Sequence, residues 1–343
     1  MNKLVSLQYV RAFAALLVVL HHVRNPAPWL WNPLVDTEFG NAGVMVFFVV
    51  SGFVMHVSCR GGSVGTFLWR RFTRIVPFYW LMTTAAFAFI SLPVLVHNPA
   101  NAEWMHYAKS LAFIPHFSPR HPDFIWPVLL PGWTLNFEVF FFALFAVGLA
   151  FGRPSSMAVL AIIFLLGAGF LLHPSSAVGI TYTNHLLVLF AFGIGIGWLH
   201  ERVDFAKLKW LAPIALAGLT LAAFKVTGDD HHALFFASSA ALVVGALGWE
   251  EALRNRPISM AELAGDASYS IYLTHPFVYP LVLGGLKHVP LSGPLQFLLV
   301  CLVTITVCTV VGIAVHTAVE KRLLVAFRKF PGNLAKARKP AAA

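Results

Sequence analysis

The sequence predicts an all-α membrane protein, a bundle of about ten transmembrane helices with both termini in the cytoplasm. Of its 343 residues, 58% are hydrophobic and only 11% are charged, and the mean hydropathy is +0.76. Ten apolar runs are long enough to cross about 30 Å of hydrocarbon. These observations exclude an ordinary soluble domain.

The ten apolar runs begin near the first residues and follow one another closely. They are residues 4–24, 42–58, 75–96, 133–151, 156–172, 182–200, 210–226, 233–249, 268–288 and 295–317. No small-residue cleavage site follows the first run clearly, so we expect that run to stay as a helix. The three cysteines show neither metal-ligand spacing nor a disulfide framework and are expected to pack.

Basic residues orient the bundle, because Lys and Arg accumulate in cytoplasmic loops. An N-terminus inside the cell places most of the 24 lysines and arginines on the cytoplasmic side. We expect residues 1–325 to form the transmembrane domain and residues 326–343 a basic, disordered cytoplasmic tail. The net charge of +10 then reflects basic loops beside an anionic membrane surface, so no nucleic-acid partner is expected.

The first run carries Arg11 and His22, eleven residues apart and separated by an apolar stretch. In an α-helix this spacing puts both side chains on one face, roughly 16 Å apart along the axis. An arginine within the membrane costs at least about 2.5 kcal/mol on insertion scales and indicates a functional role. The alternative is that Arg11 only reaches to the cytoplasmic interface.

Glu138 lies near the start of the fourth run, which descends from the outer side. Counting from Trp133, its carboxylate is about 8 Å below the outer boundary, at a depth similar to that of His22. A carboxylate beside a histidine fixes the imidazole tautomer, as a general base requires. We therefore predict that Glu138 and His22 act as a pair, the alternative being that each only satisfies a polar neighbour.

A second polar group is predicted at the inner surface. Arg70, Arg71 and Arg74 lead into the third run, with Tyr79 in the aromatic belt that follows. Such a cluster is typical of a cytoplasmic anchor, although guanidinium groups also bind phosphates bidentately. In the ninth run, Tyr272 and His275 share one helix face that should point into the bundle.

The longest outer connection, residues 97–132, leaves two interpretations open. It contains a short possible helix near Glu103–Phe113 and a Pro- and His-rich segment from Pro115 to Pro131. A lid over an outer cavity and a packed connector both fit this pattern.

Five motifs in order resemble the acyltransferase family 3 membrane proteins, over about residues 4–325. The opening segment and the absence of an appended domain are most similar to the exopolysaccharide O-acetyltransferase branch. Two positions depart from the family pattern: Met45 replaces a frequent acidic residue, and Thr134 replaces a serine. The motifs are Arg11 with His22, Phe47–Phe53, Arg71–Trp80, Trp133–Leu135 with Glu138, and Ser268–Leu273 with His275.

The resemblance implies transfer of an acetyl group from cytoplasmic acetyl-CoA to a hydroxyl of an exopolysaccharide or glycolipid on the periplasmic side of the bacterial inner membrane. It marks Arg11 and His22 as essential and implies no metal. Polysaccharide biosynthesis or export proteins are the expected partners. The residues assigned to CoA are Arg70, Arg71, Arg74, Tyr79, Tyr272 and His275.

In the resulting hypothesis, the CoA phosphates bind the arginines, its arm passes Arg11, and His22, oriented by Glu138, deprotonates the acceptor hydroxyl. Whether Arg11 touches the donor or holds a neighbouring helix stays open. Ser51 lacks a nucleophile-elbow context and is interpreted as a packing serine. A transporter or flippase and a non-catalytic scaffold are the alternative functions; the first would show an inverted repeat, which we do not find.

Overall fold

The computed structural model describes residues 3–23, 29–59, 63–91, 104–226 and 231–328, and within these ranges its regular elements are all helices, without a β-strand. The all-α prediction is therefore confirmed. Among the described residues, seven helical segments are long and apolar enough to cross a membrane. They are α1 (Val5–Val23), α2 (Phe39–Ser58), α5 (Gly132–Ala150), α6 (Pro154–Leu172), α7 with α8 (Ala177–His200), α10 (His231–Gly248) and α14 with its continuation (Gly293–Arg328).

Each of the other three predicted runs is also helical but falls short of those criteria. Helix α3 (Val64–Ser91) begins at Val64 rather than at residue 75, and its arginines lower its apolarity. Helix α9 (Leu211–Ala223) has 13 residues, about 20 Å. Helix α13 (Ser268–Leu286) opens with polar residues and contains two prolines. The predicted tail from residue 329 onward lies outside the described residues.

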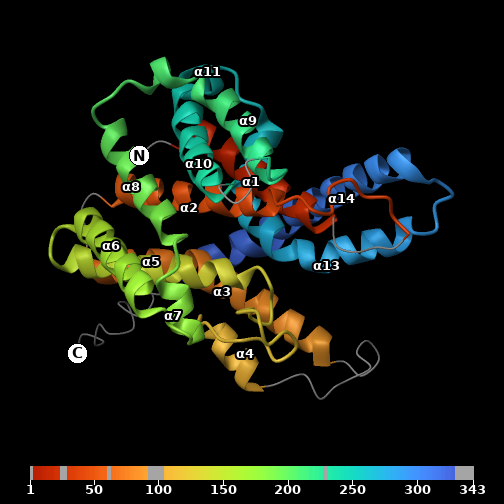
Figure 1. Cartoon of the computed structure of the whole chain (residues 1–343), viewed down its shortest axis with the longest axis horizontal. Helices are drawn as coiled ribbons and strands as arrows, with labels where there is room; N and C mark the ends of the chain where they lie inside the picture. Colours follow the sequence, from red (N-terminus) through yellow and green to blue (C-terminus); the bar gives the residue numbers. More distant parts are fainter. Residues whose placement is uncertain (1–2, 24–28, 60–62, 92–103, 227–230, 329–343) are drawn as a thin grey trace, which may run out of the picture.

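Helices α1 and α2 lie at the centre of the molecule (Figure 1). In that view α13 and α14 (Gly293–Val315) form a hairpin that projects to the right, and α3 projects below them with α4 (Trp104–Leu111). Small residues let the central helices approach closely: a Cβ on Gly52 of α2 would lie 2.1 Å from the carbonyl oxygen of Phe190 in α8 (Leu187–His200).

Helix α4 and the segment that follows it are held against α3 by side-chain hydrogen bonds. Tyr79 donates to the carbonyl of Ser110 (3.1 Å), and the indole of Trp80 donates to that of Leu111 (2.8 Å). Tyr182, from α7 (Ala177–Tyr182), donates to the carbonyl of Phe113 (3.3 Å). For residues 104–131, the structure therefore favours a packed connector over a mobile lid.

This connector makes α5 begin deep in the bundle. A Cβ on Gly132, the first residue of α5, would lie 2.6 Å from the hydroxyl of Tyr79, which is in the middle of α3. The start of α5 is thus level with the middle of α3 and not with its end. The depth of residues on α5 cannot be counted from the outer boundary, as the sequence argument assumed.

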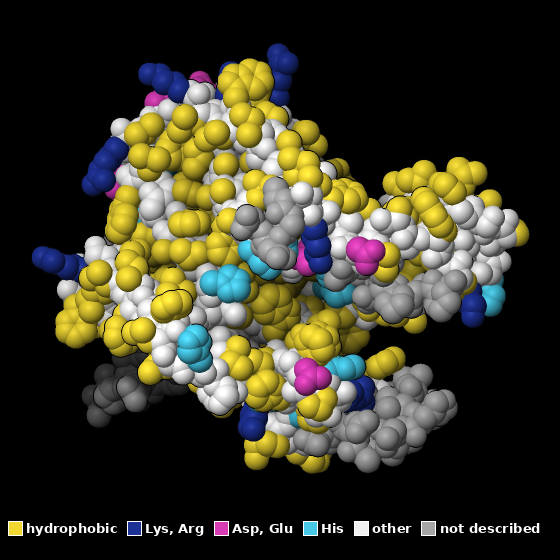
Figure 2. Space-filling model, in the orientation of Figure 1, with side chains coloured by type: hydrophobic (Ala, Val, Ile, Leu, Met, Phe, Trp, Pro, Cys, Tyr) yellow, Lys and Arg dark blue, Asp and Glu magenta, His cyan; other side chains and the backbone are white. Residues whose placement is uncertain are grey.

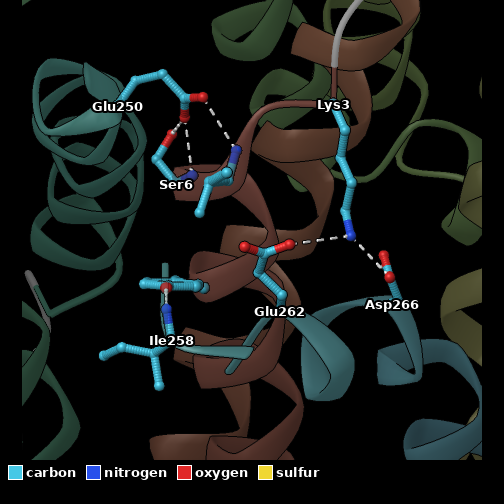
Figure 3. A network of polar contacts seen from close by, with 8 residues as sticks. Lys3, Ser6, Glu250, Ile258, Glu262 and Asp266 are labelled. Atoms are coloured by element: carbon cyan, nitrogen blue, oxygen red, sulfur yellow. Dashed lines mark hydrogen bonds and ion pairs between the residues drawn. The ribbon is translucent and has the colours of Figure 1, made fainter. Parts of the chain in front are cut away.

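The N-terminal end of α1 is fixed by α11 (Glu250–Asn255) and α12 (Ser259–Asp266), as Figure 3 shows. The carboxylate of Glu250 accepts hydrogen bonds from the amides of Val5 and Ser6 and from the Ser6 hydroxyl, at 3.1, 2.8 and 2.6 Å. These are the amides that a helix leaves unpaired in its first turn. Lys3 pairs with Asp266 at 2.7 Å, so the axial position of α1 is set by distant residues.

Candidate active site

Arginines from two helices meet around the N-terminal half of α1. Arg71 and Arg74 lie on one face of α3, three residues apart. Arg74 is also close enough to Arg11 of α1 for the two positive charges to interact. Arg71 donates to the hydroxyl of Ser58 (2.8 Å), and its guanidinium lies 5.6 Å from the ring centroids of Phe67 and Phe142. These contacts hold the guanidinium of Arg71 in place between α2, α3 and α5.

Two carboxylates accompany these arginines. Glu138 accepts a hydrogen bond from the hydroxyl of Ser51 (3.2 Å). It also interacts electrostatically with Arg74, Arg71 and Arg11. Glu320 acts on Arg11 in the same way. The arginine cluster, as we name it, consists of Arg11, Arg71, Arg74, Glu138 and Glu320. With three cations and two anions, its side chains carry a net positive charge.

Glu320 belongs to a π-helical turn, His316–Glu320, that continues α14. Its carboxylate accepts hydrogen bonds from Nδ1 of His316 and from the Ser270 hydroxyl, both at 2.6 Å. His316 and Glu320 are buried, with 6% and 8% of their surface exposed. Sequence reasoning missed this group, although π-turns often mark functional sites and the two side chains are four residues apart.

The C-terminal half of α1 carries a different group, which we name the histidine cluster: His22, His275, Tyr272 and Tyr279. The ring of His22 lies 4.8 Å from that of His275 and is stacked on Tyr279 at 5.4 Å, measured between centroids. The ring centroids of Tyr272 and His275 are 6.0 Å apart. The structure thus brings together residues from α1 and α13 that are at least 250 positions apart in the sequence.

The tautomer of His275 follows from its neighbour Pro276. Proline has no amide hydrogen, so it leaves the carbonyl of Tyr272, four residues earlier, without its helical donor. The Nδ1 of His275 lies 2.7 Å from that carbonyl and donates to it. Its Nε2 therefore carries the lone pair; this atom is buried and has no hydrogen-bond partner among the described residues.

The histidine cluster is closed on one side by the start of α5. The hydroxyls of Tyr272 and Thr134 are 2.9 Å apart, and both lie within hydrogen-bond distance of the carbonyl of Pro131. Thr134, which departs from the family pattern, thus supplies the hydroxyl that a serine would. Within the described ranges, no group of three or more His, Cys, Asp or Glu side chains is arranged to hold a metal ion.

Glu138 bonds to Ser51 and lies near three arginines, whereas the sequence-based prediction paired it with His22. The ring of His21 lies against Gly40 of α2, whereas Glu138 bonds to Ser51, eleven residues further along the same helix. That spacing corresponds to roughly 16 Å. Because α5 begins deep in the bundle, its fifth to seventh residues reach the depth of Arg11 rather than that of His22.

The residues predicted to bind CoA lie in four different places. Arg71 and Arg74 join the arginine cluster, whereas Tyr272 and His275 lie with His22. Arg70 is exposed, which fits the anchoring interpretation. The hydroxyl of Tyr79 is engaged with the connector after α4.

The chain is similar to known proteins. A family model described as "Acyltransferase domain" matches residues 4–313. The chain is 37% identical over 293 residues to the exopolysaccharide production protein ExoZ of Rhizobium meliloti (strain 1021), covering 83% of this chain and 90% of that protein. It is 31% identical over 149 residues to the acyltransferase MdmB of Streptomyces mycarofaciens, covering 42% and 38%. No solved structure matches the chain.

Proposed function

The chain belongs to the acyltransferase family whose model matches residues 4–313, and from this premise we propose that it acetylates a hydroxyl of an exopolysaccharide or glycolipid. The relative from Rhizobium meliloti, named for exopolysaccharide production, supports that class of acceptor. The proposed donor is acetyl-CoA from the cytoplasm. The proposed location is the bacterial inner membrane, beside proteins of polysaccharide synthesis or export.

The proposed orientation has ten spans, with both termini in the cytoplasm. On the face drawn in Figure 2, Lys and Arg side chains gather along the edge formed by α8 to α11. The connections at this edge contain Arg202, Lys207, Lys209, Arg254 and Arg256. Since cytoplasmic loops are rich in basic residues, this edge is assigned to the cytoplasm. The arginine cluster then faces the donor's side and the histidine cluster faces the acceptor's side.

The arginine cluster suits an anionic donor. Arg71 and Arg74 lie nearest the cytoplasmic end and bind the diphosphate of CoA through guanidinium groups. Arg11, about 16 Å below His22 on the same helix, lies beside the route of the arm that carries the thioester. Glu138 and Glu320 balance part of the positive charge while no donor is bound, which lowers the cost of burying three arginines.

The histidine cluster suits a neutral acceptor. His22 is the proposed general base and removes the proton from the acceptor hydroxyl, whose oxygen then forms a bond to the thioester carbon. The carbon–sulfur bond breaks, and the protonated His22 gives its proton to the leaving sulfur, so no net proton is released. His275, with Nε2 as a fixed acceptor near His22, takes the orienting role that the sequence argument gave to Glu138.

One observation carries this proposal: a single helix joins a charged cluster to a histidine cluster in a chain of an acyltransferase family. The test uses purified full-length protein in liposomes, with acetyl-labelled CoA on one side and a hydroxyl-bearing glycan on the other. We expect label on the glycan and free CoA in equal amounts. Movement of the glycan without consumption of acetyl-CoA would instead indicate a transporter.

A further inference from the structure

A second site lies outside both clusters, at the cytoplasmic ends of three helices. A cavity of about 390 Å³ is lined by the end of α2, the start of α6 and the end of α8. Its volume is in the range of small-molecule sites. The side chains that matter here are His56, Cys59, Arg153, Ser155, Trp198 and Glu201.

The floor of this cavity is a connected set of polar side chains. Nδ1 of His56 lies 2.8 Å from the hydroxyl of Ser155, and its Nε2 lies 3.2 Å from the carboxylate of Glu201. Trp198 contacts the ring of His56 edge to face, with centroids 5.9 Å apart. Ser155 is buried, whereas Arg153 is exposed at the rim. The cavity therefore combines an aromatic surface, hydrogen-bonding groups and a cation.

One wall of the cavity lies next to Arg71 of the arginine cluster. Cys59 lines the cavity, and the preceding residue, Ser58, accepts the 2.8 Å hydrogen bond from Arg71. Arg71 also lies close enough to Cys59 for its charge to act on the thiol. A ligand that fills the cavity and extends past Cys59 therefore meets Arg71 first and then Arg74 and Arg11.

We propose that this cavity binds the 3′-phosphoadenosine end of the acyl-CoA donor, an inference that rests on the proposed function. The purine stacks on Trp198, as nucleobases do on aromatic side chains. Arg153 pairs with the 3′-phosphate. Glu201, which already accepts from His56, accepts further hydrogen bonds from the purine amino group or the ribose hydroxyl. The diphosphate then leads to Arg71, and the arm continues along α1.

The test measures binding of three probes to the full-length protein in nanodiscs: CoA, 3′-dephospho-CoA, and adenosine 3′,5′-bisphosphate. We expect Arg153→Gln to weaken CoA binding about tenfold and to leave the affinity for 3′-dephospho-CoA unchanged, since only the first probe carries the 3′-phosphate. Trp198→Leu should weaken the binding of all three probes about tenfold. Arg256→Gln, which removes an exposed cytoplasmic arginine outside the cavity, is the matched control and should bind like the unmodified protein.

Each result has a distinct meaning. If the unmodified protein binds CoA and both cavity variants bind it equally well, the cavity is not the nucleotide subsite, while the proposed donor stands. If the unmodified protein binds no CoA, the proposed donor itself is wrong. A phospholipid headgroup is the competing phosphate source. If Arg153→Gln loses retained phosphatidylglycerol in native mass spectrometry but keeps its affinity for CoA, the cavity is a lipid site and the inference is overturned.

Discussion

The two clusters joined by α1 differ in the chemical groups that they contain. The arginine cluster holds five charged side chains in a partly or fully buried position, whereas the histidine cluster consists of imidazole and phenol groups. The rings that contact His275 are those of His22, Tyr272 and Tyr279. One cluster is built to balance charge, and the other presents lone pairs and hydroxyls.

This difference predicts where substitutions act. Removing one partner from a buried set of charges typically costs about 3–5 kcal/mol, because the remaining charges lose their compensation. Replacing a neutral imidazole that contacts other rings costs less. Changes in the arginine cluster should therefore affect folding and donor binding together, and changes in the histidine cluster should affect turnover alone.

The largest effect is expected from His22→Ala. Loss of a general base should lower acetyl transfer by about 10²- to 10⁴-fold, while the protein still inserts and binds acetyl-CoA. The measurement is label transfer in liposomes, with donor affinity determined separately. His288→Ala removes an exposed histidine from the end of α13 and serves as the control. Normal turnover by His22→Ala would remove the catalytic role from the histidine cluster.

Glu138→Gln decides to which cluster Glu138 belongs. We expect it to lower the free energy of unfolding by about 3 kcal/mol, because Arg11, Arg71 and Arg74 lose an anion. The KM for acetyl-CoA should change, with kcat within tenfold of normal. Thermal unfolding and steady-state kinetics measure both quantities. A fall in kcat as large as that of His22→Ala, at unchanged stability, would restore the pairing predicted from the sequence.

Glu250→Gln tests the anchor at the N-terminal end of α1. Partial burial works to raise the pKa of Glu250, but hydrogen bonds from Ser6, Arg254 and Val5 outweigh it and hold that pKa below its usual value. The ionised carboxylate therefore stabilises the fold above about pH 4.3, and this contribution is lost as the pH falls through the lowered pKa. We expect a loss of about 1 kcal/mol at pH 7.

The matched control for that variant is Glu251→Gln, since Glu251 is exposed on the same helix. Unfolding curves at pH 7 and pH 4 separate the two variants. If both change stability equally, Glu250 does not hold the first turn of α1.

The smallest effect is expected in the connector after α4. Nδ1 of His106 lies 2.6 Å from Nε2 of His116, whose Nδ1 donates to the carbonyl of Ile114. Burial, together with the charges of His116, Arg120 and Lys109, lowers the pKa of His106 to about 4. The unfolded segment therefore binds a proton more readily between about pH 6.5 and pH 4, and local stability falls as the pH decreases through this window.

Hydrogen exchange of residues 104–131 at pH 7 and pH 5 measures this effect. His106→Gln should reduce the pH dependence of the exchange rate. His121→Gln, which replaces an exposed histidine of the same connector, should leave it unchanged. An unchanged exchange rate across this range in the unmodified protein would show that the histidine pair does not stabilise the connector.

The sequence predicted the helical elements well because apolar runs have a clear length and period. Each of the ten runs overlaps a helix within the described residues, and the spacing of Arg11 and His22 indicated their separation along α1 directly. The short helix near Glu103–Phe113 is present as α4, with Glu103 itself outside the described residues. These are local properties, which the order of residues determines.

The depth of α5 could not be read in the same way, because it depends on how Tyr79 and Trp80 hold the connector. That tertiary contact sets the depth at which Glu138 lies near the arginines. The tautomer of His275 was in principle readable, since Pro276 frees the carbonyl of Tyr272. The buried Glu320 group gave a weaker signal, because its partner Ser270 is fifty positions away.

The anchoring of α1 by residues from Glu250 to Asp266 sets an order of assembly. Helix α1 leaves the ribosome first, but the side chains that fix its axial position are synthesised much later, since Lys3 and Asp266 are 263 positions apart. A nascent chain without α12 thus lacks the register that places Arg11 and His22 at their depths. The two clusters on α1 are therefore complete only after α13 and α14 have also been inserted, since these helices supply His275, Tyr279 and Glu320.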